Sequence, residues 1–413
     1  MNIFILVWSY LKARPLNTAI NVILLSLGIA VITILLLFKK QLDQKITDNS
    51  KGIDLVIGAK GSPLQLILCN IFHIDFPTGN IKLNEAERIA KNRLIRTAIP
   101  LALGDSYRAY RIIGTSSKFR ELYQAKLAEG AWWKNNLEVN IGSNVARLAG
   151  LRIGDEFTSA HGLTQEGHAH NEHRYIVKGI LQKTNTVLDN LILTNVESIW
   201  EMHETGDAHD APEGDSVTAR SSLVPSVAAG DSVKQITALL IKYRSPMAAV
   251  QLPRLINAES SLQAASPAFE TARLFSILGV GVDVIMAFAY VLILISALSI
   301  FIALYNSLKE RRYDMAVMRS MGASRSKLLV SILAEGGLLT LLGCMVGLLM
   351  GHVVVIMLSS MVEQAQKAGI TGIIFYSEEW VILGGSLLLG LLCALIPAMQ
   401  AYRTDISSVL ARN

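Results

Sequence analysis

The chain has 413 residues, of which 51% are hydrophobic and 17% are charged, and its mean hydropathy is +0.41. A soluble domain carries about 25% charged residues, so this composition excludes an ordinary soluble protein and indicates a membrane protein. The formal net charge of +5 does not point to nucleic acid, because much of it lies in the short flanks of apolar segments.

Four apolar segments are long enough to cross a membrane, because about 20 helical residues span the hydrocarbon core. They are residues 17–38, 275–305, 328–358 and 380–402. We interpret the first as an uncleaved anchor rather than a signal peptide, since its apolar run is long and no A-x-A-like site precedes Lys39.

The Lys and Arg residues beside the spans indicate how the spans are oriented, because flanks rich in these residues stay on the cytoplasmic side. They are concentrated in residues 1–16, 306–327 and 403–413. The opposite side then holds a short loop at 359–379 and a large domain at 39–274. We therefore predict an α-helical membrane protein with a 1+3 arrangement of spans and a large extracytoplasmic domain between the first two.

The domain at 39–274 has mixed periodicity and is long enough for its own core. Its expected strands are residues 53–59, 107–114 and 175–181, and its expected helices are residues 83–94 and 252–264. These patterns predict a mixed α/β fold. Two polar stretches, 160–174 and 203–230, have the composition of mobile loops.

A row of small residues marks the third span. Gly343, Gly347 and Gly351 form a GxxxGxxxG pattern, which favours close helix–helix packing in lipid, although glycine is also simply common in such helices. His352 follows the row near the outer half of the span. An ionisable residue inside a membrane is a functional candidate by default.

The segment between the second and third spans is unusually charged. Tyr313, Val317 and Met321 lie at i, i+4 and i+8, which predicts a short amphipathic helix along the membrane surface. Gly322 is expected to end this helix and Ser324 to begin the next. The apolar face then needs a partner, either lipid headgroups or a cytoplasmic protein.

Half of the eight histidines lie in HGLTQEGHAHNEH: His161, His168, His170 and His173. Imidazoles at this density can bind Zn²⁺, Cu²⁺ or Ni²⁺, but the spacing matches no rigid structural site. The alternative is a solvated hairpin tip. The pattern therefore leaves zinc binding open.

Three stretches resemble one family. KERRYDMAVMRSMGAS at residues 309–324 resembles the ER-x-x-E/D-φ-x-φ-x-R-x-φ-G-A-S block of the MacB/FtsX-type (type VII, LolC/E-like) ABC transporter permeases. Residues 140–155, NIGSNVARLAGLRIGD, resemble part of that family's periplasmic core domain. Residues 396–410 resemble its closing pattern, with Ile406 in place of the usual proline.

The resemblance implies that the charged segment is a coupling helix that docks on an ABC ATP-binding subunit. The residues implied in coupling are Glu310, Arg311, Arg312, Asp314, Met315, Met318, Arg319, Gly322 and Ala323. ATP and Mg²⁺ would bind to that partner subunit and no cofactor directly to this chain. In support, the chain has no G-x-x-x-x-G-K-[ST] phosphate loop.

The resemblance also implies a location and a mechanism. The chain would lie in a bacterial inner membrane with its large domain in the periplasm. It would pair with a second copy or a related permease, contact membrane lipid, and work with a periplasmic adaptor or lipoprotein. ATP-driven movement would be transmitted across the membrane to export or extract lipoprotein, lipid, peptide or drug.

Two other functions stay open at this point. One is a metal-linked (zinc) transport system that uses the histidine-rich loop. The other is a transmembrane regulator of a periplasmic hydrolase or signalling partner. An enzyme is not expected, because the chain has neither an HExxH nor a G-x-S-x-G motif.

Overall fold

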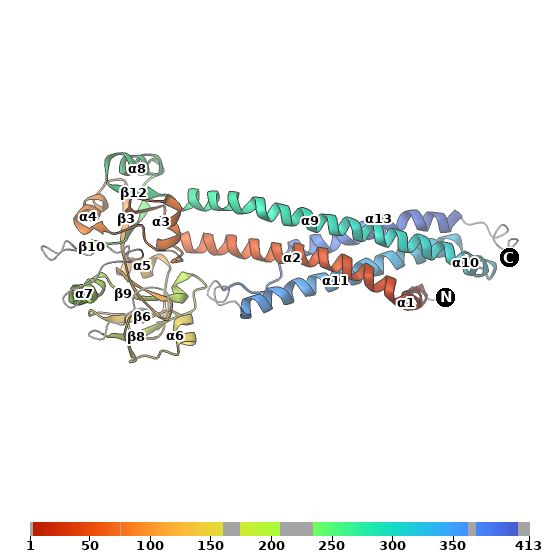
Figure 1. The fold of residues 1–413 in the computed structure, drawn as a ribbon, viewed down its shortest axis with the longest axis horizontal. Coiled ribbons are helices and arrows are strands. Elements are labelled where there is room, and N and C mark those ends of the chain that lie inside the picture. Colours follow the sequence, from red (N-terminus) through yellow and green to blue (C-terminus); the bar gives the residue numbers. More distant parts are fainter. Residues whose placement is uncertain (1–2, 75, 160–173, 207–233, 362–368, 404–413) are drawn as a thin grey trace, which may run out of the picture. The chain divides into compact units, whose positions relative to one another are not determined.

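The computed structural model describes residues 3–74, 76–159, 174–206, 234–361 and 369–403 (Figure 1). These residues divide into two compact units. A membrane unit comprises residues up to Leu42 and from Leu278 onward, and an outer unit comprises Asp43–Ile277. The α/β part of the chain is therefore inserted between the first and second long helices.

Within the described residues, four helices are long and apolar enough to cross a membrane. They are α2 (Pro15–Ser50), α9 (Pro267–Glu310), α11 (Arg325–Met361) and α13 (Glu378–Arg403). Two shorter helices accompany them: α1 (Ile3–Ala13) and α10 (Arg312–Ser320). An apolar run in lipid must satisfy its backbone hydrogen bonds internally, which is why each becomes a helix.

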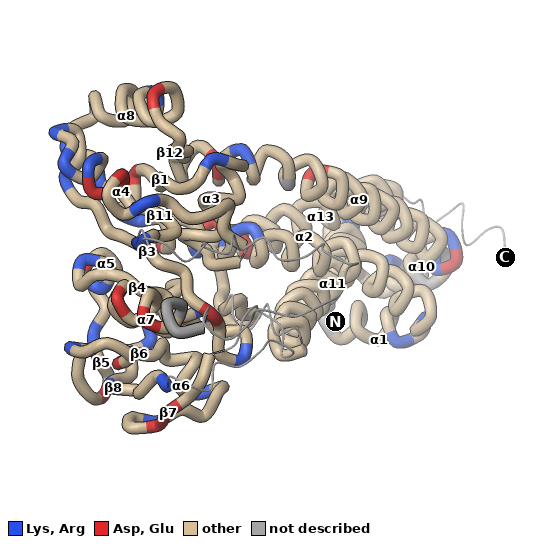
Figure 2. Tube along the Cα trace, turned by 60° about the vertical axis from the view of Figure 1, so that its left-hand side comes forward, with Lys and Arg blue, Asp and Glu red and all other residues tan. Residues whose placement is uncertain are grey.

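The long helices share a small buried core. Leu25 and Ile29 of α2 pack with Ile300 of α9, Cys344 of α11 and Ala394 of α13. In Figure 2 these helices are tan over most of their length, and charged residues gather near α10. Charge is thus confined mainly to the helix ends, as lipid requires.

The outer unit is built on a sheet that has ten strands among the described residues, in the order β12-β1-β11-β3-β4-β9-β6-β8-β5, with β7 paired to β8. Its strands are β1 (Leu55–Ala59), β3 (Ile95–Tyr107), β4 (Tyr110–Thr115), β5 (Leu127–Gly130), β6 (Glu138–Ile141), β7 (Glu156–Phe157), β8 (Tyr175–Leu181), β9 (Leu191–Asn195), β11 (Ala238–Tyr243) and β12 (Leu262–Ala265). The pairs β4–β9 and β6–β8 are parallel. The sheet is therefore mixed.

Helices and a short ribbon complete the outer unit. The helical elements are α3 (Pro63–Asn70), α4 (Leu83–Ala90), α5 (Ser117–Leu122), α6 (Ser143–Ala149), the 3₁₀ turn η1 (Val187–Asn190), α7 (Val196–Gly206) and α8 (Pro246–Glu259). The ribbon pairs β2 (Ile81–Lys82) with β10 (Gln235–Ile236).

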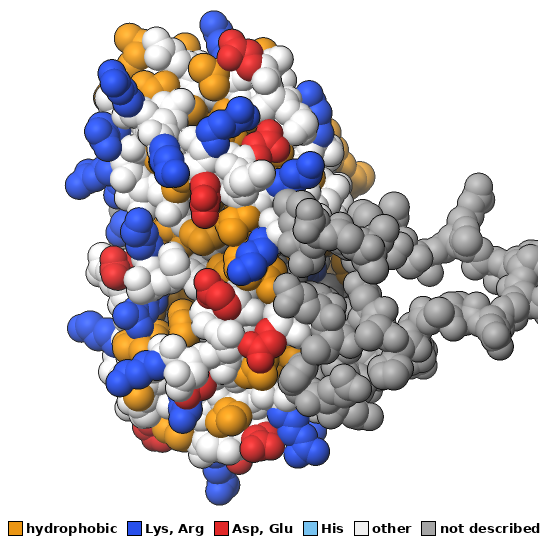
Figure 3. Space-filling view, turned by 90° about the vertical axis from the view of Figure 1, so that its left-hand side faces the viewer, with side chains coloured by type: hydrophobic (Ala, Val, Ile, Leu, Met, Phe, Trp, Pro, Cys, Tyr) orange, Lys and Arg blue, Asp and Glu red, His pale blue; other side chains and the backbone are white. Residues whose placement is uncertain are grey.

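Both faces of the sheet are buried. On β1, Leu55 and Ile57 belong to one hydrophobic cluster and Val56 belongs to another, because alternate side chains point to opposite faces. The outer surface seen in Figure 3 intersperses Lys and Arg with Asp, Glu and apolar side chains, as is typical of a surface in water.

Three of the expected elements in the outer unit are corrected by the structure. The helix expected at 83–94 ends at Ala90, because Asn92 accepts a hydrogen bond from the N–H of Leu94 at 2.9 Å and turns the chain into β3. The strand expected at 107–114 is a hairpin, because Arg108 and Ala109 both adopt positive φ angles (47° and 65°) and turn β3 into β4. The turn was missed because neither residue is the Gly or Asn that usually signals it. The helix expected at 252–264 ends at Glu259, since the residues after it pair with β1 as strand β12.

Candidate functional site

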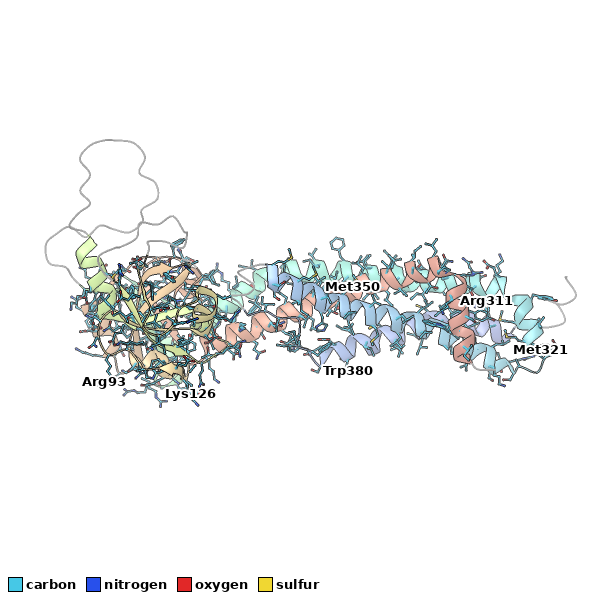
Figure 4. The ribbon with its side chains drawn as sticks, turned by 90° about the horizontal axis from the view of Figure 1, so that it is seen from below. Arg93, Lys126, Arg311, Met321, Met350 and Trp380 are labelled. Atoms are coloured by element: carbon cyan, nitrogen blue, oxygen red, sulfur yellow. The ribbon has the colours of Figure 1, made fainter. Side chains whose placement is uncertain are left out.

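The candidate site is the junction of α9, α10 and α11. Helix α9 ends at Glu310, and Arg311 leaves the helical conformation before α10 begins. Figure 4 shows Arg311 at this junction and Met321 farther along, where α10 ends. The charged segment is thus a bent connection between two long helices.

The end of α10 has the geometry that the Gly-Ala-Ser sequence predicts. Gly322 has a φ of +95°, and its N–H donates to the carbonyl of Arg319 at 3.0 Å. The N–H of Ala323 donates to the carbonyl of Met318 at 3.0 Å, which completes a Schellman motif. The Ser324 hydroxyl then accepts from the N–H of Lys327 at 3.4 Å, so it caps α11. Gly322 and Ser324 therefore set the angle between the two helices.

The buried face of α10 differs from the stripe inferred from spacing. Met315 and Ala316 are buried, and Met315 packs with Leu328 and Ile332 of α11 and with residues of α13. In contrast, the side chains of Tyr313 and Met321 are 48% and 75% exposed. The expected amphipathic helix is present, but the stripe that includes Tyr313 and Met321 faces away from the chain's own core.

Arg311 connects the junction to the interior of the membrane unit. Its Nη1 donates to Oε2 of Glu335 on α11 at 3.2 Å, and the two side chains are only 14% and 9% exposed. Its guanidinium also lies 3.7 Å from the ring centroid of Tyr10 on α1, which is a cation–π contact. A buried, charged hydrogen bond of this kind holds α9, α11 and α1 together at one point.

A second contact reinforces the same corner. Glu310, the last residue of α9, forms an ion pair with Arg14, just before α2. Helix α1 itself packs on α11 through Val7 and Leu11, which contact Leu339. Contacts from Arg14 and α1 therefore also hold the junction.

Sequence reasoning missed Glu335, Tyr10 and Arg14. Glu335 is an acidic residue inside the predicted third span, and that alone is a signal that it has a buried partner. Spacing along the chain could not identify Arg311 as that partner, because Glu335 lies on α11 and Arg311 lies at the bend before α10.

The other predicted residues are placed as follows. The side chains of Arg312 and Asp314 lie outside the described residues, while Met318 and Arg319 are partly buried.

The glycine row of α11 lies against α2. A Cβ built on Gly343, Gly347 or Gly351 would approach Leu25, Ser26 or Thr33 to within 2.7–2.8 Å. The helices can come this close only because these residues are small.

The proposed metal ligands His161, His168, His170 and His173 lie outside the described residues. Among the residues that are described, no group of three or more His, Cys, Asp or Glu side chains is placed to hold a metal ion.

Comparison with known proteins identifies the family. Residues 286–406, which include the whole junction, match the FtsX-like permease C-terminal family. Residues 18–243 match the MacB-like periplasmic core domain. The chain belongs to the MacB/FtsX-type family of ABC transporter permeases. This permease is thus a multi-pass membrane protein with the domain order of its family.

One relative is similar to part of this permease. An uncharacterized ABC transporter permease of Methanocaldococcus jannaschii is 28% identical over 134 residues, which is 32% of this permease and 33% of the relative. The match therefore spans about a third of that relative's length.

Two solved structures are similar to part of this permease. The periplasmic region of MacB from Actinobacillus actinomycetemcomitans has 13% identity and a TM-score of 0.34, covering 56% of this permease and 98% of that structure. The extracellular domain of the ABC-type transporter YknZ from Gram-positive bacteria has 10% identity and a TM-score of 0.30, covering 52% of this permease and 99% of that domain.

Proposed function

We propose that the chain is the membrane subunit of an ABC transporter and transmits ATP-driven movement from a separate ATP-binding subunit to its outer unit. The observation that carries the proposal is the two-sided character of α10. One side is joined to the long helices through Met315 and the Arg311–Glu335 bond, and the other presents Tyr313 and Met321 to a partner.

This arrangement suits a mechanical connection. A displacement of α10 would act on α9 and α11 together, since Arg311 and Glu335 link the two helices and Gly322 fixes the turn between α10 and α11. Packed helices with two discrete arrangements can carry such a displacement across a membrane. The buried Glu335 is already paired, so the described helices offer a rigid connection rather than a charged pathway for a solute.

The proposal includes the partners and the setting of the family. The motor is an ABC ATP-binding subunit that holds ATP and Mg²⁺, and a second copy or a related permease completes the membrane part. The outer unit lies in the periplasm of a bacterial cell and acts on lipoprotein, lipid, peptide or drug at the outer face of the inner membrane, with or without a periplasmic adaptor.

The experiment compares two exposed methionines, Met321 at the end of α10 and Met361 at the end of α11. Met321→Glu places a charge on the exposed face of α10, where Met321 is 75% exposed, and Met361→Glu places the same charge where Met361 is 79% exposed. The full-length chain and its ATP-binding subunit are reconstituted in nanodiscs, and ATP hydrolysis and subunit association are measured.

We expect Met321→Glu to weaken association and stimulated ATP hydrolysis about tenfold, which corresponds to about 1.4 kcal/mol, because a charge would be buried at the docking surface. Met361→Glu should leave both unchanged. Equal behaviour of the two variants would exclude docking through α10.

A further inference from the structure

His352 lies in the last third of α11, between two hydrogen-bonding partners. Its Nδ1 is 2.6 Å from the carbonyl oxygen of Gly372, and its Nε2 is 2.9 Å from Oε2 of Glu379 at the start of α13. Both side chains are only 6% exposed. The ring of Phe375 covers the imidazole, with 4.2 Å between the ring centroids.

The chemistry of these contacts determines how many protons the pair holds. A carbonyl oxygen can only accept, so Nδ1 must carry a hydrogen and donate to Gly372. A neutral imidazole has a single N–H, and its Nε2 would then present a lone pair to a carboxylate oxygen that also presents lone pairs. The 2.9 Å contact is attractive only when one more proton lies between Nε2 and Glu379.

We propose that His352 and Glu379 form a proton-binding site that holds residues 371–377 against α11. The proton is taken from the adjoining water and returned to it. It sits either on Nε2, which makes an imidazolium and a carboxylate, or on Glu379, which makes a neutral pair. When it leaves, two lone pairs face each other and the contact opens.

The same segment is attached to α2, so the site is connected to the helix packing. The side chain of Gln41 both donates to the carbonyl of Thr371 and accepts from its N–H, each at 2.8 Å. The other oxygen of Glu379 accepts from the N–H of Tyr376 at 2.9 Å. Opening of the site would therefore loosen the connection between α2, α11 and α13.

Three further titratable groups face this site. Lys40 of α2 is 2.5 Å from the carboxylate of Glu378 on α13, so their charges compensate each other. Tyr376 lies in the connecting segment, and burial raises the pKa of its phenol, opposed by Lys40 and supported by Glu378 and Glu379. Its phenol therefore stays neutral, which leaves His352 and Glu379 as the pair that exchanges a proton.

Substitution of Glu379 by Gln separates proton binding from the structure of the site. In Glu379→Gln the amide N–H₂ donates to the lone pair of Nε2, and the amide oxygen still accepts from Tyr376. The site then closes without any extra proton. His352→Ala removes the site altogether, and Asp283→Asn serves as a control because Asp283 is an exposed carboxylate elsewhere, on α9.

The test is hydrogen–deuterium exchange of the full-length chain in nanodiscs over a range of pH, corrected for the intrinsic exchange rates. In the wild type, protection of amides in residues 371–377 should fall as pH rises. Glu379→Gln should keep its protection at every pH, His352→Ala should lack it at every pH, and Asp283→Asn should follow the wild type.

Wild-type protection that does not change with pH would overturn the proposal, and so would a Glu379→Gln profile equal to that of the wild type. The measurement requires no ATP-binding subunit. Failure of the proposed transport function would therefore leave this result unaffected, and the two failures can be told apart.

Discussion

Arg311 donates a hydrogen bond to Glu335 from the bend between α9 and α10, and in doing so it joins two long helices at a buried point. The same guanidinium lies 3.7 Å from the centroid of the Tyr10 ring. Because a charged pair with little exposure needs both partners, this bond is a point where a single substitution should disturb the whole junction.

Arg311→Ala should therefore lower the stability of the membrane unit by about 3–5 kcal/mol, since it leaves the carboxylate of Glu335 buried and unpaired. The double variant Arg311→Met with Glu335→Leu should recover much of that loss, because no charge remains buried. Thermal unfolding of the full-length chain in nanodiscs measures both. If Arg311→Ala and the double variant unfold at the same temperature, the buried pair does not hold the junction.

Gly322→Leu should distort the turn after α10. A Cβ at this position would meet nothing within 4 Å, so the main cost we expect comes from the φ of +95°, which costs a residue with a side chain about 1–2 kcal/mol. Stimulated ATP hydrolysis should fall while membrane insertion is retained. Gly322→Asn is the control, because asparagine tolerates positive φ and should retain most of the stimulation. Equal loss in both variants would contradict a conformational cause.

Gly347→Leu should separate α11 from α2. A Cβ on Gly347 would lie 2.7 Å from the backbone oxygen of Ser26, whereas a Cβ on Gly384 in α13 would meet nothing within 4 Å. Overpacking of this kind costs about 1–3 kcal/mol. Cross-linking between cysteines introduced on α2 and α11 should be reduced by Gly347→Leu and unchanged by Gly384→Leu. Unchanged cross-linking in both would show that the glycine row is not needed for the contact.

Acid should destabilise the outer unit through Glu138. Partial burial favours the protonated form of its carboxyl, but hydrogen bonds from Lys134, Asn135 and Lys178 outweigh it and lower the pKa to about 2. The unfolded chain has the ordinary value of 4.5, so this stabilisation is complete above pH 4.5 and is lost as pH falls toward 2.

Glu138→Gln should accordingly lower the free energy of unfolding of the outer unit by about 1–3 kcal/mol at neutral pH. This difference from the wild type should become smaller as the pH falls. Tryptophan fluorescence of the full-length chain follows the transition, because Trp132 and Trp133 precede the loop that bonds Glu138. Glu129→Gln, an exposed site, should change stability by no more than about 0.5 kcal/mol. A difference in the free energy of unfolding between Glu138→Gln and the wild type that grows in acid would contradict this prediction.

Zinc binding by the histidine-rich segment stays a prediction. Calorimetric titration of the full-length chain with Zn²⁺, after removal of competing chelators, should show a heat of binding. This heat should disappear when His161, His168, His170 and His173 are replaced by Asn. Replacement of His352 by Asn should leave that heat unchanged. A heat of zinc binding that persists without the four histidines would show that the metal binds elsewhere.

Much of the local structure could be read from residue order. The apolar runs determine long helices, because lipid leaves no other way to satisfy the backbone. Gly322 and Ser324 predict where α10 ends and α11 begins, since both act within a single turn. Tyr175–Leu181 is a short run rich in aromatic and β-branched residues, so it could be recognised as a strand before its partners were known.

Where side chains meet across elements was decided only by the tertiary structure. The sequence by itself determined four spans, an inserted α/β domain and a charged, glycine-ended helix between the second and third spans. It did not determine that Arg311 meets Glu335, that His352 meets Glu379, or that Met315 rather than Met321 faces the core. The physical reason is that periodicity specifies the faces of a helix, while its rotation and contacts depend on packing against residues distant in the chain.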